Sequence, residues 1–231
     1  MIKGIEGVAF DLDGTLYPNY RLNVRLLPFI LKEARLLISF GKARKIIRRE
    51  QENDSSASYP KKDFYKYQAE KTAELLSVEA QPLQEKIERL IYRGWEPLFK
   101  KVKMFSAADT ALIEIKKAGY KMGILSDFPL VNKLEYLKIS HFWDAALCSE
   151  ELGVIKPHRL PFDELSKAMS LPPEKIIYVG NSHPYDVAGA SRVGMKTAWI
   201  RSPLSPGKGS KIPKPDFSFS NYRQFINFML N

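Results

Sequence analysis

The chain has 231 residues and a formal net charge of +10, with 45% hydrophobic and 27% charged residues, proportions that are ordinary for a soluble globular protein. A chain of this length can bury a sizeable core, in one large domain or two smaller ones. The composition excludes an internal disulfide, because Cys148 is the single cysteine, and no apolar stretch is long enough to span a bilayer.

These features predict a cytoplasmic protein. A single cysteine fits a reducing compartment, where we expect Cys148 to be a core residue, and the N-terminal sequence MIKGIEG lacks the apolar middle of a signal peptide. The excess of positive charge attracts phosphorylated metabolites, nucleic acid and acidic lipid alike. It does not choose between these partners, and nothing in the sequence indicates the oligomeric state.

The first predicted strand is the apolar run VAF at residues 8–10, which ends at Asp11, Asp13 and the turn residue Gly14. Open α/β sheets bind their ligands at the carboxyl ends of such strands. Two carboxylates so close together need a cation or a shared proton, and a hard divalent cation would meet that need. The alternative interpretation is an acidic turn in which an aspartate caps the next helix.

A helical segment follows this strand, from about residue 23 to residue 101. Apolar residues recur there with helical spacing in three stretches, near residues 26–37, 64–75 and 83–92. The predicted breaks between helices fall around Gly41, at residues 53–60 and at Pro82. We therefore predict an all-helical domain at residues 17–103, inserted into a core made of residues 1–16 and 104–231.

The most basic part of this insertion is the sequence GKARKIIRRE at residues 41–50. One interpretation is a solvated helix face with a short apolar seam, and the other is a surface that binds nucleic acid or another polyanion. The sequence leaves both interpretations open.

Strands and helices alternate in the rest of the chain, which predicts a parallel sheet covered on both faces. A helix capped by Ser106 and ended by Gly119 comes first. The further predicted strands are residues 122–125, 145–148, 176–179, 197–200 and 217–219. The further predicted helices are residues 131–137, 162–169, 186–193 and 222–229. The loop at residues 202–215 is rich in Pro, Gly and Lys, and we expect it to be mobile.

Polar residues follow four of the predicted strands. They are Asp11 and Asp13 after the first strand, Ser126 and Asp127 after the second, Lys156 beyond the third, and Asn181 to Asp186 after the fourth. Because the carboxyl ends of parallel strands meet at one edge of a sheet, we expect these side chains to converge. Taken alone, Ser126 is equally compatible with a helix cap and Lys156 with a surface loop.

The motifs resemble those of the haloacid dehalogenase (HAD) superfamily, with DLDGT at residues 11–15, LSD at 125–127, VIKPH at 154–158, and VGN at 179–181 with Asp186. The resemblance covers the α/β part of the chain and implies a Rossmann-like, doubly wound parallel sheet. The helical insertion directly after the first motif is similar to the C1 cap of the superfamily's phosphatase-rich branch. A lid of that kind implies selection of a small substrate.

The chemistry of the residues suits phosphoester hydrolysis. An aspartate is ionised at neutral pH, so Asp11 needs no activating base to attack phosphorus and form an acyl phosphate. Asp13 is expected to protonate the departing oxygen and then to activate water. Ser126 and Lys156 would hold the phosphoryl oxygens. Asp13 also argues against dehalogenation, because a halide leaving group needs no proton.

The resemblance implies Mg²⁺ as cofactor. Asp11, Asp186 and the backbone carbonyl of Asp13 are the expected ligands. Asn181 stands where many members of the superfamily have an acidic residue, so we expect it to be a weaker ligand and metal affinity to be reduced. The residues assigned to phosphate binding are Gly14, Thr15, Ser126, Asp127 and Lys156. Asp127 is also a candidate for a supplementary acidic group near the metal.

We therefore expect an HAD-type phosphatase acting on a small phosphorylated metabolite through an aspartyl phosphate on Asp11. The alternatives are a catalytically weak protein that binds nucleic acid or an acidic partner through its basic insertion, and a phosphomutase that uses the same residues. Tyr17, Arg93 and Trp95 are candidates for lining the substrate site. None of the three histidines is assigned a catalytic role.

Overall fold

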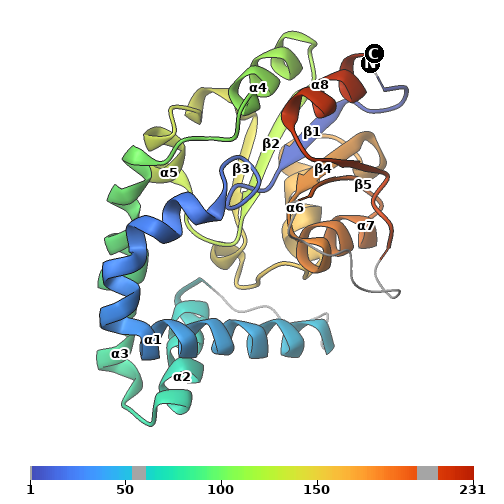
Figure 1. Cartoon of the computed structure of the whole chain (residues 1–231). Helices are drawn as coiled ribbons and strands as arrows, with labels where there is room; N and C mark the ends of the chain where they lie inside the picture. The colour runs from blue at the N-terminus through green and yellow to red at the C-terminus, as the bar shows by residue number, and fades with distance from the viewer. Residues whose placement is uncertain (1, 54–60, 202–212) are drawn as a thin grey trace.

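The protein is built around a six-stranded sheet in which every strand pair is parallel, as the sequence predicts. The computed structural model describes residues 2–53, 61–201 and 213–231. The strand order is β3-β2-β1-β4-β5-β6, so β1 lies in the interior of the sheet, between β2 and β4 (Figure 1). The strands are β1 (Gly7–Phe10), β2 (Lys121–Ser126), β3 (Ala145–Cys148), β4 (Ile176–Gly180), β5 (Lys196–Ile200) and β6 (Phe217–Phe219).

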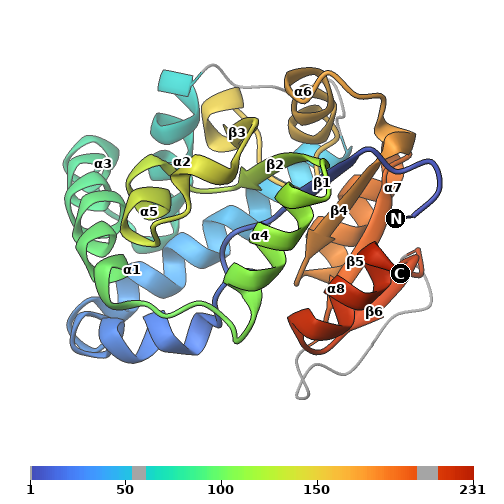
Figure 2. The ribbon, with the colours of Figure 1, turned by 90° about the horizontal axis from the view of Figure 1, so that it is seen from above.

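Alternate residues of β1 enter different hydrophobic clusters because successive side chains of a strand point to opposite faces. Val8 and Phe10 pack with residues of α4 (Ala108–Lys117) and α8 (Tyr222–Leu230). Ala9 packs instead with residues of α6 (Leu160–Ala168). Figure 2 shows α4 and α8 on one side of the sheet and α6 on the other. Strand β1 is therefore buried on both faces, and the polar residues Asp11 and Asp13 come only after its carboxyl end.

The remaining elements of the core connect these strands. They are α5 (Val131–Tyr136), α7 (Ala188–Arg192), the 3₁₀ segments Ser140–Phe142, Glu150–Leu152 and Pro173–Lys175, and the π-helical segment His183–Val187. The predicted end of α4 is confirmed, because Gly119 follows it with a left-handed φ of +85°. The predicted cap is wrong. Ala107 is the N-cap, and the Phe105 carbonyl, in place of the Ser106 side chain, accepts a hydrogen bond from the Ala108 N–H.

A helical insertion follows β1, and it lies beyond the carboxyl ends of the strands (Figure 1). Its elements are α1 (Asn19–Asn53), α2 (Lys61–Leu76), α3 (Ala80–Ile87), the π-helical segment Glu88–Arg93 and the 3₁₀ segment Glu96–Lys101. The three helices share a hydrophobic cluster of their own, to which Leu36, Phe40, Ala69, Ala73, Leu83 and Ile87 contribute. The domain limits at residues 16 and 103 remain a prediction.

The predicted break at Gly41 is wrong, and the break predicted at Pro82 lies a few residues earlier, at residues 77–79 between α2 and α3. Gly41 lies inside α1, and the bend of that helix is at Glu33, whose φ and ψ are −118° and 25°. A stripe of buried residues, Leu36, Phe40, Ala43 and Ile47, runs past Gly41 with helical spacing, and this packing outweighs the low helix propensity of one glycine. Pro82 lies in the first turn of α3, where its missing N–H has no helical partner to lose.

Part of the chain lies outside the described residues. The predicted break at residues 53–60 and the predicted mobile loop at residues 202–215 fall largely there, since residues 54–60 and 202–212 are not described. Within residues 2–53, 61–201 and 213–231, no helix combines the length and the apolar composition that crossing a membrane requires.

The position of Gly41 yields a stability prediction. A Cβ added at Gly41 meets no atom within 4 Å, so Gly41→Ala should raise the free energy of unfolding by about 0.5–1 kcal/mol in urea titrations. Gly123→Ala is the matched contrast, because a Cβ there would lie 2.5 Å from Met169 Sδ and should destabilise the sheet by about 1–3 kcal/mol. A loss of stability with Gly41→Ala would show that α1 does not continue through this position.

Candidate active site

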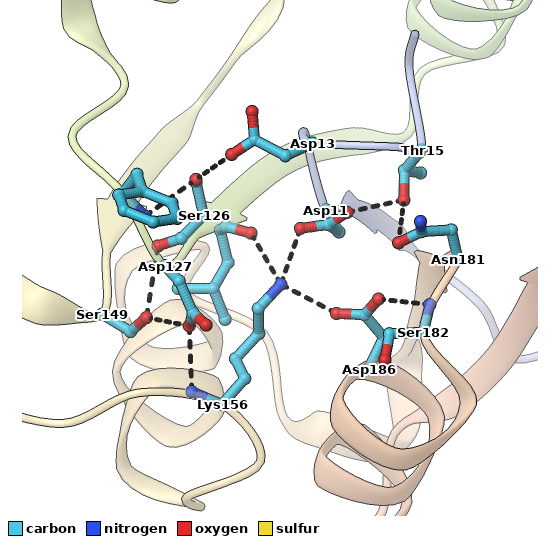
Figure 3. A network of polar contacts seen from close by, with 12 residues as sticks. Asp11, Asp13, Thr15, Ser126, Asp127, Ser149, Lys156, Asn181, Ser182 and Asp186 are labelled. Atoms are coloured by element: carbon cyan, nitrogen blue, oxygen red, sulfur yellow. Dashed lines mark hydrogen bonds and ion pairs between the residues drawn. The ribbon is translucent and has the colours of Figure 1, made fainter. Parts of the chain in front are cut away.

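Asp11, Lys156 and Asp186 meet at the carboxyl ends of the strands (Figure 3). Lys156 Nζ lies 2.7 Å from Asp11 Oδ1 and 2.8 Å from Asp186 Oδ1, and all three side chains are almost completely buried. The same ammonium lies 3.3 Å from the Tyr178 hydroxyl. One lysine therefore bridges two carboxylates that are 175 positions apart in the chain, and the predicted convergence of these three residues is confirmed.

The approach of Asp186 to this point depends on a glycine. Gly180 ends β4, and a Cβ at that position would lie 2.3 Å from the Cβ of Asp186. Asp186 Oδ2 accepts a hydrogen bond of 2.9 Å from the Ser182 N–H, which fixes the carboxylate toward Lys156. The Gly-Asn-Ser sequence after β4 is thus a turn that carries Asp186 back to the sheet edge.

Burial and charge act against each other at this cluster. Burial, and to a smaller extent the charges of Asp186 and Asp13, raise the pKa of Asp11 from 3.8 to about 7, although Lys156 opposes the shift. Burial alone would lower the pKa of Lys156, but Asp11 and Asp186 outweigh it and raise that pKa well above its ordinary value. Lys156 therefore stays a cation, whereas the Asp11 carboxyl binds a proton more readily than an exposed aspartate does.

Asp13 has a separate partner of its own. Lys133 Nζ, from α5, lies 3.0 and 2.9 Å from its two carboxylate oxygens, and Ser126 Oγ donates to it at 3.1 Å. The Tyr17 hydroxyl also donates to Asp13. Burial would raise the pKa of Asp13, but Lys133 and the hydrogen bonds from Tyr17, Lys133 and Ser126 bring it below its ordinary value. Asp13 is thus ionised at neutral pH.

Asp11 has a second set of neighbours in Gly14, Thr15 and Asn181. Thr15 Oγ donates to Asp11 Oδ2 at 2.6 Å and lies 3.5 Å from Asn181 Oδ1. Gly14 has a left-handed φ of +91°, and a Cβ there would lie 2.2 Å from Asn181 Nδ2. Glycine is therefore required at this turn, because it lets the Asn181 amide come against Thr15.

The Asp127 carboxylate is occupied by contacts within the protein. Asp127 Oδ1 accepts hydrogen bonds from Ser149 Oγ at 2.6 Å and from the Lys156 N–H at 2.9 Å (Figure 3). Asp127 Oδ2 accepts from Arg48 at 2.8 Å. Burial opposes the effect of Arg48, Lys156 and Arg44, but their charges hold the pKa of Asp127 well below its usual range. The Asp127 side chain therefore joins the insertion to the core. The roles expected of Asp127 in phosphate binding and near the metal stay predictions.

A family model described as haloacid dehalogenase-like hydrolase matches residues 8–200, which include β1 except for Gly7, all of β2 to β5, and every residue of this site. The chain belongs to the haloacid dehalogenase-like hydrolase family.

Similar proteins agree with this assignment. A protein of Methanopyrus kandleri named glyceraldehyde 3-phosphate phosphatase is 26% identical to this hydrolase over 96% of each chain. A HAD phosphatase of Thermococcus onnurineus has the same fold, with a TM-score of 0.63 over 98% of each chain and 20% identity. An L-2-haloacid dehalogenase of Xanthobacter autotrophicus has a TM-score of 0.69 over 97% of this chain and 98% of its own, at 16% identity. The last two likenesses concern the fold alone.

The oxygen atoms around Asp11 fit a hard cation such as Mg²⁺. Asp11 and Asp186 already share one cationic partner, and the Asn181 amide oxygen lies beside Thr15, next to Asp11. Carboxylate and amide oxygens with added waters suit Mg²⁺. Across residues 2–53, 61–201 and 213–231, no group of three or more His, Cys, Asp or Glu side chains could hold a metal. A metal site in this hydrolase would therefore carry only two carboxylates.

An aromatic cavity of about 220 Å³ opens beside Asp13. Tyr17 and Trp95, two of the residues expected to line a substrate site, do line it. Arg93 does not. It pairs with Glu88 at 2.9 Å on the surface and lines a second cavity, which shares Tyr92 and Pro129 with the first. Its role at a substrate site stays a prediction.

Sequence reasoning missed three basic residues of this hydrolase. Lys133 lies between Leu130 and Leu134, so a helix places it on the buried face, and that apolar setting was a usable signal. Arg44 and Arg48 are one helical turn apart on α1 and reach the core together. Arg44 pairs with Glu150, and Arg48 donates to the Lys156 carbonyl at 2.9 Å. Of the basic segment at residues 41–50, these two side chains are therefore committed to internal contacts. Lys42, Lys45 and Arg49 remain exposed, and a polyanion surface there stays a prediction.

Because the pKa of Asp11 is raised, we predict that ionisation of Asp11 lowers the free energy of unfolding of the metal-free protein. Between pH 4 and pH 7 the folded wild type binds more protons than the unfolded chain, so its stability falls as the pH rises. Asp11→Asn removes that loss. In urea titrations with EDTA we expect the variant to be more stable than the wild type by about 1–2 kcal/mol at pH 8, and this gain to vanish near pH 4. A variant that is less stable at pH 8, or a difference that does not change with pH, would contradict this electrostatic account.

Proposed function

We propose that this hydrolase is a Mg²⁺-dependent phosphatase that acts on a small phosphomonoester through an aspartyl phosphate on Asp11. One observation carries the proposal: a second carboxylate, Asp13, lies beside Ser126 at the edge of the same sheet. An alcohol leaving group needs a proton, whereas a halide does not. The name of the Methanopyrus kandleri relative supports the same reaction class.

In the proposed reaction, Asp11 attacks phosphorus with one carboxylate oxygen. Thr15 binds Asp11 Oδ2 and Lys156 binds Oδ1, so the carboxylate is held in one orientation. Lys156 favours its ionised, nucleophilic form. Bound Mg²⁺, held by Asp11, Asp186 and Asn181, would supply positive charge that neutralises the phosphoryl oxygens.

Asp13 moves the protons. It is ionised in the free protein, and the negative charge of an arriving phosphoryl group raises its pKa, so that it takes up a proton from solvent as the substrate binds and can then give that proton to the leaving oxygen. The carboxylate that results can then take a proton from the water that hydrolyses the aspartyl phosphate. Lys133 and Tyr17 hold Asp13 in place for both steps.

Ser126 and Lys156 would bind the phosphoryl oxygens. The Ser126 hydroxyl already accepts a hydrogen bond from the Phe128 N–H at 3.2 Å, which orients it toward the site. Lys156 is a fixed point charge between Asp11 and Asp186. Preorganised donors of this kind stabilise the charge that spreads over the oxygens as the bond breaks. A phosphomutase would use the same groups, and the test below separates the two by measuring free phosphate.

The proposal is tested with a panel of phosphomonoesters and Mg²⁺, by measuring the phosphate released. We expect Asp11→Asn to lose at least about 10³-fold in kcat, because the nucleophile is gone, and Asp13→Asn to lose about 10²- to 10⁴-fold. EDTA should abolish turnover, and Mg²⁺ should raise the unfolding temperature of the wild type but not of Asp11→Asn.

The control is Asp109→Asn, an exposed aspartate on α4 that should keep its activity within about twofold. The proposal fails if wild type releases no phosphate from any member of the panel, or if Asp11→Asn turns over as fast as wild type. Release of chloride from 2-chloropropionate without phosphatase activity would instead show a dehalogenase.

A further inference from the structure

The aromatic cavity beside Asp13 bears on which phosphomonoester this hydrolase accepts. In the proposed function Asp13 gives its proton to the leaving oxygen, so the leaving group must lie next to Asp13. Asp13 and its partner Lys133 both line the cavity of about 220 Å³. The organic part of the substrate would therefore lie in this cavity, and the residues that line the cavity indicate which organic groups it can accept.

The walls of this cavity are mainly apolar, and aromatic rings make up much of them. They include Tyr17, Tyr92, Trp95, Phe99, Phe128 and Pro129. The rings are fixed by one another: Tyr17 and Phe99 meet edge to face at 5.6 Å, and Tyr92 and Phe128 lie 6.0 Å apart. Such surfaces favour flat, apolar ligands, which stack or pack edge to face against them.

Asp13 and Lys133, two of the polar residues that line the cavity, are already paired with each other, and Asn19 and Glu96 are the other two. Lys133 and Tyr17 both bind Asp13, and the Lys133 ammonium lies 5.0 Å from the centre of the Phe99 ring and 5.3 Å from that of Phe128. A polyol in the cavity would bury hydroxyls against these carbon surfaces, which is costly unless each hydroxyl finds a partner.

The size of the cavity agrees with a ring. An apolar cavity of about 150 Å³ is enough to bind benzene. The 220 Å³ beside Asp13 leaves room for a six-membered ring with a substituent.

We propose that the substrate is a phosphomonoester whose alcohol carries a planar, largely apolar ring, and that this ring lies in the cavity formed by Tyr92, Trp95, Phe99 and Phe128. The inference rests on the proposed phosphatase function and specifies its substrate class. It differs from the triose phosphate in the name of the Methanopyrus kandleri relative.

The test compares benzyl phosphate with glycerol 3-phosphate and glyceraldehyde 3-phosphate. Benzyl phosphate and glycerol 3-phosphate both release a primary alcohol, so their intrinsic reactivity is similar and the comparison reports on binding of the organic group. We expect kcat/KM for benzyl phosphate to be about ten- to hundredfold higher than for glycerol 3-phosphate. Phe128→Ala should reduce this ratio at least about fivefold. The ratio is measured on one protein sample, so a partly unfolded variant does not distort it.

Leu31→Ala, on the exposed face of α1 where Leu31 is 74% exposed, is the control and should leave the ratio unchanged. A ratio near or below one in the wild type, with phosphate released from the glycerol or triose ester, would overturn the inference and leave the phosphatase function standing. A high ratio that neither Phe128→Ala nor Trp95→Ala reduces would overturn the assignment of the ring to this cavity. No hydrolysis of any ester would defeat the phosphatase function itself, and with it this inference.

Discussion

The site depends on one buried cation, the Lys156 ammonium, which lies between Asp11 and Asp186. Two buried carboxylates at the ends of buried strands repel each other and lose their hydration. The turn after β4 could not hold them together without a positive charge between them. Lys156 supplies that charge but leaves one negative charge uncompensated. Burial, together with this uncompensated charge, raises the pKa of Asp11, and a metal ion would relieve the charge imbalance.

Asp11 and Asp13 differ in role because they differ in partner. Asp11 shares Lys156 with another carboxylate, whereas Asp13 has Lys133 to itself, with Tyr17 as a further donor. The first carboxylate therefore has a raised pKa and the second a lowered one. Lys133, which pairs with Asp13, also lines the aromatic cavity. The same residue thus connects proton transfer with the recognition of the leaving group in the account proposed here.

The sequence predicted the parts of the site that follow from sheet topology. Asp11, Lys156 and Asp186 could be placed together because parallel strands end at one edge, and hydrophobic runs locate those ends. Side chains that reach the site from helices were harder to foresee. Lys133 had a usable signal in its apolar neighbours, but whether Arg44 or Arg48 faces the core depends on how α1 is rotated against the core, and single-sequence periodicity does not determine that. The continuation of α1 through Gly41 was missed for a related reason, since the stripe from Leu36 to Ile47 outweighs one residue's propensity.

The account's central physical claim is that the Lys156 charge holds Asp11 in the fold, and a double-mutant cycle measures it directly. Urea unfolding at pH 8 in EDTA would be compared for wild type, Lys156→Met, Asp11→Asn and the double variant. The account predicts that Lys156→Met alone costs about 3–5 kcal/mol, and that adding Asp11→Asn recovers at least about 2 kcal/mol more than Asp11→Asn gains in the wild type. Additive effects, with a coupling energy below about 0.5 kcal/mol, would contradict it.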